Sequence, residues 1–399
     1  MTPDPLSYGL FLVGVRGSVA TTVLHGLEGL RSGYPPVGML TETDLFSDQP
    51  LVSTNNLRIS GWDVAGDLHQ SAAELARLNV LPRDLVDLSA LLRDRVESEI
   101  APGIPEPEDE KLVDSKSADR AKLPAKEQLE ALRGDLRQWV ESGRLRGGVV
   151  VHLASAERER KLAPEWMDRD ADPIALLDSA PIDFPPSILY ALAAILEGMP
   201  YVNFTPSPGA SLPAVAGFAS RQGVPVLGND GKTGETLVKT ALAPMFRDRA
   251  LKVLAWEGYN MLGNRDGAAL ADPARKAAKI KNKDQVLPAI LGESATRHTG
   301  VSIDFVPSLH DWKTAMDYIH FEGFLGVQMS MQFTWHASDS ALAAPLVLDL
   351  ARLALLAQSR GHAGPLHAAA PFFKNPIEVD EQDFHRQMEI LTKWLAVQS

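Results

Sequence analysis

Apolar and polar positions in the first half of the chain alternate between short strand-like runs and longer helical patterns. Leu10–Val13 is an apolar run that leads into a turn with two glycines, and an amphipathic segment over Thr21–Leu30 follows it. Alternating strands and helices predict a doubly wound parallel sheet of the α/β class, whose ligands bind at the carboxyl ends of the strands. Similar units recur with strand patterns at Gly148–Leu153 and Tyr201–Phe204 and helical patterns at Lys126–Val140 and Pro186–Leu196.

Beyond Lys239 the hydrophobic pattern changes to longer segments in which apolar and polar residues alternate. Such alternation is typical of antiparallel strands that have one covered face. A strongly apolar helix is predicted after Asp339, and the chain ends with a last helical pattern. We predict strands of the alternating kind at Leu251–Trp256, Val301–Val306 and Gly326–Trp335.

Two further segments of the first half have patterns of their own. A second strand is predicted to end near Met39–Leu40, and Glu42 and Asp44 follow it, roughly where an acidic residue that binds a ribose often lies. Residues 100–125 are charged and poor in apolar side chains. We therefore interpret them as a mobile excursion and not as a domain.

The composition narrows the class of protein. A net charge of -12 and a pI near 5.3 argue against a nucleic-acid binder, although a local basic pocket is compatible with them. The chain has no cysteine, which excludes disulfides, thiolate catalysis and zinc sites that use cysteine. No H-E-x-x-H motif is present, so we expect no zinc site and assign no metal ligand; the sequence does not decide whether the protein requires another divalent or a monovalent cation. The first residues lack a basic n-region and no apolar run approaches ~20 residues, so we expect a cytoplasmic protein without a membrane partner.

The first glycine turn is a candidate nucleotide-binding site. Residues 14–20 read GVRGSVA and lie between a predicted strand and a predicted helix, which is the context that a dinucleotide fingerprint requires. Glycine lets the backbone approach a pyrophosphate, and the helix N-terminus supplies free N–H groups. The spacing is G-x-x-G and not the full G-x-G-x-x-G, so an ordinary tight turn is the alternative.

A second turn of similar character follows a predicted strand at Pro225–Leu227. Residues 228–235 read GNDGKTGE and open a helix. Their N–H groups and the Thr233 hydroxyl are suited to cradle a phosphate. The turn is not a Walker A motif, because the earlier glycine is missing at the required spacing. A plain strand-to-helix turn is the alternative.

Lysines gather in one short stretch of this acidic chain. Residues 276–284 read KAAKIKNKD, and Lys276, Lys279 and Lys283 share one face if the stretch is helical. Such a face repels itself unless an anion lies on it, and a phosphorylated substrate is the obvious candidate. For the stretch alone, a solvated basic helix is the simpler interpretation.

Nine short motifs follow one another along the chain. They read GVRGSVATT, SGWD, YVNFTPS, LGNDGKTGET, YNMLGNRDG, KIKNKD, HDWKTAMD, SDSALAAPLVLDL and FFKNP. In this order they resemble the myo-inositol-1-phosphate synthase family in its bacterial form. The resemblance implies a Rossmann-like domain, formed by residues 1–238 and 343–399, that is interrupted by a mixed α/β catalytic and tetramerisation domain over residues 239–342. It also implies NAD as cofactor, a sugar phosphate as substrate and a homotetramer.

The implied reaction converts glucose 6-phosphate to myo-inositol 1-phosphate by oxidation, enolisation, intramolecular aldol closure and a reduction that regenerates NAD. Three oxygens need charge stabilisation in turn, and ammonium groups can donate to each of them. The resemblance assigns proton transfer at the carbon 5 oxygen to Lys279, and stabilisation of the enolate and of the carbon 1 oxyanion to Lys313 and Lys374. Lys283 is expected to hold the phosphate. Asp339 is expected to orient a lysine, or else to cap the helix that follows it.

The other site residues are transferred from the family motifs position by position. Asp63 of SGWD matches the adenosine-side aspartate, and we prefer it to Glu42 or Asp44 as the ribose-binding acid. The expected catalytic residues are Lys279, Lys283, Lys313, Asp339 and Lys374. The expected cofactor-binding residues are Gly14, Val15, Arg16, Gly17, Ser18, Val19, Asp63, Ala154, Ser155, Asp230, Asn264 and Asp266. The expected substrate-binding residues are Thr233, Gly234, Glu235, Thr236, Asn260 and Lys283.

The chain departs from the family at two positions, and alternatives to the full reaction stay open. Arg16 lies in a turn that is richer in glycine and asparagine in the family, so it is a candidate contact for the pyrophosphate or the adenine; Arg265 stands where asparagine is common. One alternative is a paralogue that cyclises another sugar phosphate, such as a ketose 6-phosphate. Another is a simple NAD-dependent sugar-phosphate dehydrogenase, which would need one acid/base group and would release NADH. A non-catalytic NAD-sensing module is the third, and the four lysines argue against it.

Overall fold

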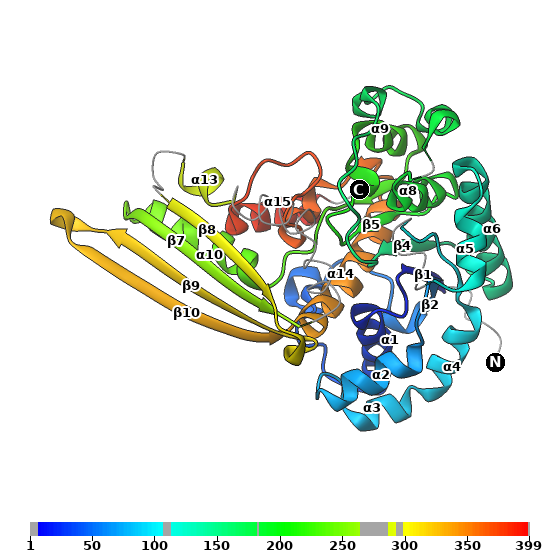
Figure 1. The fold of residues 1–399 in the computed structure, drawn as a ribbon, viewed down its shortest axis with the longest axis horizontal. Helices are drawn as coiled ribbons and strands as arrows, with labels where there is room; N and C mark the ends of the chain where they lie inside the picture. The colour runs from blue at the N-terminus through cyan, green and yellow to red at the C-terminus, as the bar shows by residue number, and fades with distance from the viewer. Residues whose placement is uncertain (1–6, 107–112, 182, 264–285, 293–297, 398–399) are drawn as a thin grey trace.

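The computed structural model describes residues 7–106, 113–181, 183–263, 286–292 and 298–397. Six residues singled out in the sequence lie outside the described residues, namely Asn264, Arg265, Asp266, Lys276, Lys279 and Lys283. The described chain forms two sheets, and the second extends from the main body as an arm (Figure 1).

The first sheet has seven strands in the order β11-β6-β5-β4-β1-β2-β3, and every neighbouring pair is parallel. This arrangement confirms the predicted doubly wound α/β fold. Strand β1 lies between β2 and β4 in the interior of the sheet, so the turn that follows β1 is placed at the carboxyl edge of the sheet. The strands are β1 (Tyr8–Val13), β2 (Leu57–Asp63), β3 (Ala101–Pro102), β4 (Gly148–His152), β5 (Tyr201–Asn203), β6 (Pro225–Leu227) and β11 (Gly364–Pro365).

Helices cover both faces of this sheet, and the side chains of β1 show why. Leu10 and Leu12 are fully buried in a cluster with α1 and α14, whereas Phe11 and Val13 point to the opposite face and pack in a cluster with α6 and α8. The first face is covered by α1 (Ser18–Arg31), α2 (Leu68–Arg77), α4 (Ala90–Glu99), α14 (Asp339–Ser359) and α15 (Phe384–Ala396). The second face is covered by α6 (Ala125–Gly143), α8 (Pro186–Leu196) and α9 (Pro213–Gln222). Of the short helices, α3 (Arg83–Leu88) packs with α1, α2 and α4, α5 (Ser115–Ala121) lies against β3, and α7 (Pro173–Leu176) lies beside α9.

The second sheet has four strands in the order β10-β9-β7-β8. Strands β7 and β10 each run antiparallel to β9, which the sequence did not predict. The strand predicted at Val301–Val306 is present as β8, but it runs parallel to β7 and not antiparallel as expected. One face is covered by α10 and α13 around the buried Trp256 and Ile319, and Met331 and Phe333 pack against the same cluster. The elements are α10 (Gly234–Asp248), β7 (Lys252–Leu262), α13 (Val286–Leu291), β8 (His298–Phe305), β9 (Trp312–Glu322) and β10 (Gln328–Ser338).

The predicted strand near Met39–Leu40 is wrong. This segment instead enters a short 3-10 helix, Leu40–Glu42, because the Asp349 carboxylate on α14 accepts the backbone N–H groups of Leu40 and Thr41 at 2.7 and 3.0 Å. Glu42 pairs with Arg352 at 2.5 Å on the same helix. The second strand of the fold is Leu57–Asp63, which places the SGWD motif at a carboxyl end. Part of residues 100–125, which we interpreted as a mobile excursion, has regular secondary structure. Ser115–Ala121 forms helix α5, and the Asp114 side chain caps its N-terminus.

Helix α14 is the strongly apolar helix that the sequence predicted. By length and composition it could cross a membrane, but 78% of its apolar window is buried inside the protein. Val347, Leu350 and Leu353 are fully buried and belong to the core cluster shared with α1 and β1. Burial of the helix in this core therefore explains its apolar character. The first residue of α14, Asp339, lies where the helix meets the end of β10.

Candidate active site

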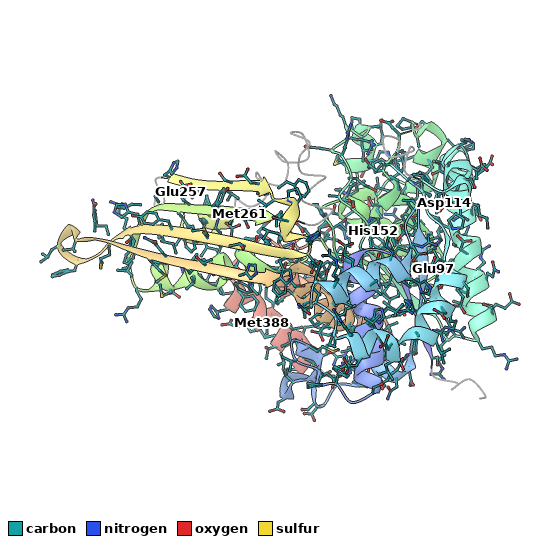
Figure 2. The ribbon with its side chains drawn as sticks, turned by 60° about the horizontal axis from the view of Figure 1, so that its bottom comes forward. Glu97, Asp114, His152, Glu257, Met261 and Met388 are labelled. Atoms are coloured by element: carbon teal, nitrogen blue, oxygen red, sulfur yellow. The ribbon has the colours of Figure 1, made fainter. Side chains whose placement is uncertain are left out.

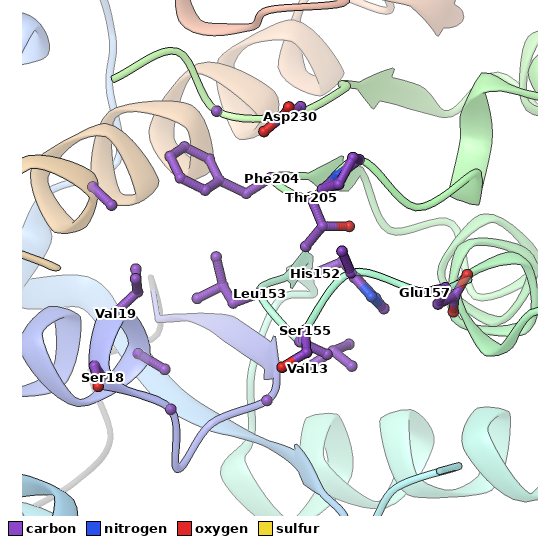
Figure 3. Close-up of a pocket in the computed structure, with 18 of the residues that line it drawn as sticks. Val13, Ser18, Val19, His152, Leu153, Ser155, Glu157, Phe204, Thr205 and Asp230 are labelled. Carbon is purple, nitrogen blue, oxygen red and sulfur yellow. The ribbon is translucent and has the colours of Figure 1, made fainter. Parts of the chain in front are cut away.

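A cavity of about 360 Å³ opens at the carboxyl edge of the seven-stranded sheet, where the arm joins the main body. Its walls come from the turn after β1, the ends of β2 and β4, the turn that opens α10, and the starts of β9 and α14. Figure 3 shows Ser18 and Val19 at the start of α1 on one side and Asp230 on the other, with Leu153 and Thr205 between them. A volume in this range is ordinary for a cofactor or small-molecule site.

The turn after β1 has the shape that a nucleotide phosphate requires. Gly14 has a φ of +83°, and a Cβ atom on it would come within 2.9 Å of the Ala154 Cα, so only glycine fits there. Gly17 is the N-cap of α1 and has no side chain to cap the helix, which leaves backbone N–H groups of the first turn to an incoming anion. Ser18 and Val19 follow and line the cavity. These features fit a dinucleotide.

Asp63 and Arg16 hold this turn in place. The Asp63 carboxylate lines the cavity and accepts the N–H groups of Arg16 at 2.7 Å and Val64 at 2.8 Å, while burial raises its pKa. The Arg16 side chain is directed to α4, where its Nη2 lies 2.5 Å from the Glu97 carboxylate. Glu97 also accepts the N–H of Leu68 at 3.0 Å. Arg16 thus contacts the protein around the turn, and its side chain is not among those that line the cavity.

The turn that opens α10 is joined to the C-terminal part of the chain. Lys374 donates its backbone N–H to the Asp230 carbonyl at 2.7 Å, and its ammonium group lies 2.8 Å from the Asp230 carboxylate. Both side chains are mostly buried, at 14% and 8% exposed. The FFKNP motif therefore reaches the site although it lies 144 residues beyond Asp230. Next to this pair, the buried Lys232 donates to Gln387 on α15.

A second lysine–aspartate pair lies at the base of the arm. The Lys313 ammonium is 3.8 Å from the Asp339 carboxylate, and a Cβ built on Gly234 would lie 3.4 Å from the Lys313 Nζ. Lys313 is therefore positioned over the first residue of α10. Asp339 is not the cap of α14, because the Ser338 hydroxyl accepts the N–H of Ala341 instead.

Asp311 fixes the position of this second pair. Its buried carboxylate accepts the hydroxyls of Ser338 at 2.5 Å and of Ser340, and its carbonyl accepts the N–H of Asp339 at 3.2 Å. Burial raises the pKa of Asp311. It ties the start of β9 to the start of α14.

Comparisons with known proteins agree with this arrangement. Residues 234–340 match the family model for myo-inositol-1-phosphate synthase. The inositol-3-phosphate synthase 1 of Bacteroides thetaiotaomicron is 33% identical, and the match covers 98% of this chain and 93% of that protein. The chain belongs to the inositol-3-phosphate synthase family.

Further members and solved structures extend the likeness over most of the chain. Inositol-3-phosphate synthase 1 of Oryza sativa is 29% identical over 87% of this chain and 74% of its own length. The crystal structure of inositol-3-phosphate synthase from Caenorhabditis elegans superposes with a TM-score of 0.82 at 26% identity, covering 98% of this chain and 86% of that chain. A myo-inositol-1-phosphate synthase-related protein from Thermotoga maritima shares the fold, with a TM-score of 0.78 at 23% identity and coverage of 98% and 99%.

In this inositol-3-phosphate synthase family member, most of the described residues expected at the site meet at the cavity. Val15 is fully buried beneath the turn, and Asn260 is buried behind Glu235. Those that line the cavity are Gly14, Gly17, Ser18, Val19, Asp63, Ala154, Ser155, Asp230, Thr233, Glu235, Thr236, Lys313, Asp339 and Lys374. Glu42 and Asp44, the alternative ribose-binding acids, do not line it.

Sequence reasoning missed some residues that line the cavity. Asp311 stands two positions before Lys313 within the HDWKTAMD motif, so the signal was present but only the lysine was singled out. Glu157 lies just after Ala154 and Ser155; it accepts the N–H and hydroxyl of Ser187, both at 2.6 Å, and burial raises its pKa to about 7.

Among the described residues, no group of three or more acidic or histidine side chains is arranged to hold a metal ion.

Proposed function

We propose that this chain cyclises glucose 6-phosphate to myo-inositol 1-phosphate with NAD as its cofactor. The observation that carries the proposal is the convergence of two lysine–aspartate pairs, Lys374 with Asp230 and Lys313 with Asp339, on one cavity that also contains the glycine turn. Family membership supplies the reaction class, and the chemistry of the cavity agrees with it. A simple dehydrogenase would have no use for two separate ammonium groups at one site.

NAD would be held by the turn around Gly14 and Gly17 and by the N-terminus of α1, with Ser155 across the cavity. When bound, it supplies reversible acceptance of a hydride. Asp63 contributes by anchoring the turn through the N–H of Arg16, so its carboxylate is positioned next to any adenosine that lies there. Asn264 and Asp266 keep their proposed place in the cofactor site from the family motifs.

Lys313 and Lys374 would stabilise the negative charge that develops on substrate oxygens during enolisation and aldol closure. Each ammonium is mostly buried, so its charge is worth more than in water. Asp339 and Asp230 hold the two lysines in place and balance their charge while the cavity is empty of anions. Lys279 remains the proposed proton shuttle, and Lys283 the proposed phosphate ligand.

The phosphate of the substrate would bind at the start of α10. Thr233 is the N-cap of this helix, and its hydroxyl makes no capping hydrogen bond. Thr233, Glu235 and Thr236 line the cavity together with Lys313. Gly234 is not among the lining residues, but the Lys313 ammonium lies beside it. A helix N-terminus favours an anion through its free N–H groups and its partial positive charge.

The assembly and location are part of the same proposal. We assign residues 1–238 and 343–399 to the NAD-binding domain and residues 239–342 to the catalytic and oligomerisation domain. We also assign the protein to the cytoplasm, where its sugar phosphate would be met, and to a homotetramer built through the arm. The arm supports this assembly because its outer face carries exposed Tyr259, Met316 and Tyr318.

The test is an assay of purified protein with NAD and glucose 6-phosphate, followed by phosphorus and proton NMR of the product. We expect myo-inositol 1-phosphate without net formation of NADH. NADH in proportion to product would indicate a simple dehydrogenase. Turnover of a ketose 6-phosphate and not of glucose 6-phosphate would indicate a paralogue with another substrate, and an absence of turnover with saturable NAD binding would indicate a sensing module.

A further inference from the structure

The proposed phosphate site contains a carboxylate that would oppose an anion. Glu235 lies in the first turn of α10, two residues after the N-cap, and it lines the cavity together with Thr233 and Thr236. Its side chain is only 1% exposed. A buried carboxylate next to a phosphate costs binding free energy unless another group compensates its charge.

Lys239, one helical turn further along α10, is placed to provide that compensation. Its ammonium group lies 2.7 Å from the Glu235 carboxylate, and its side chain is 3% exposed. The other carboxylate oxygen accepts the amide of Asn260 on β7 at 2.6 Å. Lys239 does not line the cavity, so it acts through Glu235 and not on the ligand.

Residues of β7 pack closely against this pair. A Cβ atom on Gly258 of β7 would lie 2.1 Å from Oε1 of Glu235 and 3.2 Å from the Lys239 ammonium, so a side chain there would displace the pair. The amide oxygen of Asn260 is buried and has no hydrogen-bond partner. Glycine at 258 and asparagine at 260 thus shape a slot between α10 and β7 that holds the carboxylate behind the phosphate turn.

We propose that Lys239 is a charge-compensating positioning residue that makes the turn Thr233–Thr236 able to bind the phosphate group of the substrate. The inference rests on the proposed function, which places a sugar phosphate at this turn. With Lys239 present, the Glu235–Lys239 pair has no net charge, and the N–H groups of the α10 N-terminus and Lys313 dominate the field at the turn. Without Lys239, the Glu235 carboxylate faces the phosphate uncompensated by this partner.

The experiment compares Lys239→Met, Glu235→Gln and the double variant by calorimetric titration with glucose 6-phosphate and, separately, inorganic phosphate, with NAD present. The matched control is Lys393→Met, because Lys393 and Glu389 form an i,i+4 pair on α15 that is 79% and 66% exposed. We expect Lys239→Met to weaken binding of both ligands about 10- to 100-fold, because a buried charge loses its partner. The double variant, with neutral groups at both positions, should recover a large part of the binding that Lys239→Met loses.

Two further readouts separate charge compensation from a merely structural role. KM should rise more than kcat falls. NAD binding should be unchanged in every variant, because the nucleotide turn lies after β1 and not on α10.

Unchanged phosphate binding in Lys239→Met, or a double variant no better than Lys239→Met, would overturn the inference. If Lys239→Met does not fold, Glu235→Gln decides. It should bind inorganic phosphate more tightly than the parent, because the Lys239 charge remains after the carboxylate charge is removed, and weaker binding would overturn the inference. A parent protein that binds neither glucose 6-phosphate nor inorganic phosphate would instead refute the proposed function itself.

Discussion

At the scale of single residues, the two lysines of the cavity differ in how closely each ammonium group is paired with a carboxylate. Lys374 faces Asp230 at 2.8 Å, whereas Lys313 lies 3.8 Å from Asp339 and reaches over Gly234. The closer pair is the stronger interaction, so Lys374 is held more tightly than Lys313. The two ammonium groups would repel each other at one cavity. The two aspartates balance their charge and so allow both to lie there.

Lys374→Met should lower kcat by ~10²–10³-fold, as expected when one charge-stabilising donor is lost. The Asp230 carboxylate would then face the cavity without this lysine, and substrate binding should weaken as well. Steady-state kinetics with glucose 6-phosphate measure both effects. Asp230→Asn in the Lys374→Met background should recover substrate binding but not kcat. A single variant with parental kcat would exclude Lys374 from the chemistry.

Lys279, the proposed proton shuttle, lies outside the described residues, but its role can be tested by substitution. Lys279→Ala should nearly abolish turnover while NAD stays bound, because the nucleotide turn lies elsewhere in the chain. Lys279→Arg should not restore turnover, since a guanidinium does not release its proton near neutral pH. Near-parental turnover of either variant would support the solvated basic helix that the KAAKIKNKD stretch alone suggests.

Lys232 gives the folded protein a pH-dependent stability. Burial and the nearby charge of Lys374 lower the pKa of Lys232 to about 7, below its ordinary value of 10.5. The folded state therefore binds this proton less tightly than the unfolded state, and the resulting penalty is fully present below pH 7 and disappears as pH rises toward 10.5. Lys232→Met removes that penalty, at a constant cost for the lost hydrogen bond to Gln387.

The melting temperature of Lys232→Met minus that of the parent protein should thus have its highest value below pH 7. This difference should decrease as pH rises toward 10.5. Lys393→Met, an exposed lysine on α15, should show no such trend. Thermal unfolding between pH 6.5 and 10 measures the difference. A gap between Lys232→Met and the parent that does not change with pH would show that Lys232 titrates normally.

At the scale of elements, the turn after β1 is held by three neighbouring elements. Its Arg16 contacts Glu97 on α4 through the side chain, Asp63 on β2 through the N–H group, and Ser71 on α2 through the carbonyl. Figure 2 shows Glu97 in the main body, well away from Glu257 and Met261 on the arm. Three elements that are distant from this turn in sequence thus set its shape.

Loss of the Arg16–Glu97 ion pair should weaken NAD binding, although neither side chain is proposed to touch NAD. Glu97→Gln and Arg16→Ala should each raise the NAD dissociation constant about 2- to 10-fold, because the pair is partly exposed and its energy is modest. The double variant should be no worse than Arg16→Ala alone. Glu99→Gln is the matched control, since Glu99 lies on the same helix and pairs with Arg58 at 3.1 Å. Calorimetry in which Glu97→Gln equals Glu99→Gln would contradict this role.

At the scale of the whole molecule, the arm has one covered and one open face. Trp256 and Ile319 are paired across β7 and β9 and are buried against α10, whereas Tyr259 and Met316, paired in the same two strands, are 39% and 47% exposed. Tyr318 on the same open face is 41% exposed. Exposed apolar residues that cluster on one sheet face are typical of an interface between subunits.

Met316→Glu together with Tyr318→Glu should therefore dissociate the proposed tetramer. Two charges on the open face would be buried without partners in any assembly that uses it. Light scattering at micromolar concentration measures the mass, and Leu91→Glu on α4, where the leucine is 86% exposed, is the control. A parent protein that is monomeric, or a double variant that keeps the parental mass, would refute an interface on this face.

The parallel sheet, the nucleotide turn and the family motifs were accessible from the sequence because each depends on neighbouring residues. Leu10–Val13 is apolar throughout because both faces of β1 are covered, and Gly14 and Gly17 recur where a helix must begin close to another strand. The alternation in β10 predicted a sheet with one covered face for the same local reason. Lys313, Lys374 and Asp339 were found through motifs, which preserve short stretches of sequence.

The tertiary structure decided everything that depends on contacts between distant segments. Asp349 and Arg352 on α14 hold the segment after Met39 as a 3-10 helix, so the predicted strand there does not form. Arg16 is drawn away from the cavity by Glu97, which lies 81 residues later, and Lys374 pairs with an aspartate 144 residues earlier. No periodicity or spacing encodes such pairs. They follow from which surfaces the packed layers bring together. The i,i+4 spacing of Glu235 and Lys239 is local, but the burial of this pair behind β7 and its place beside the cavity depend on tertiary packing.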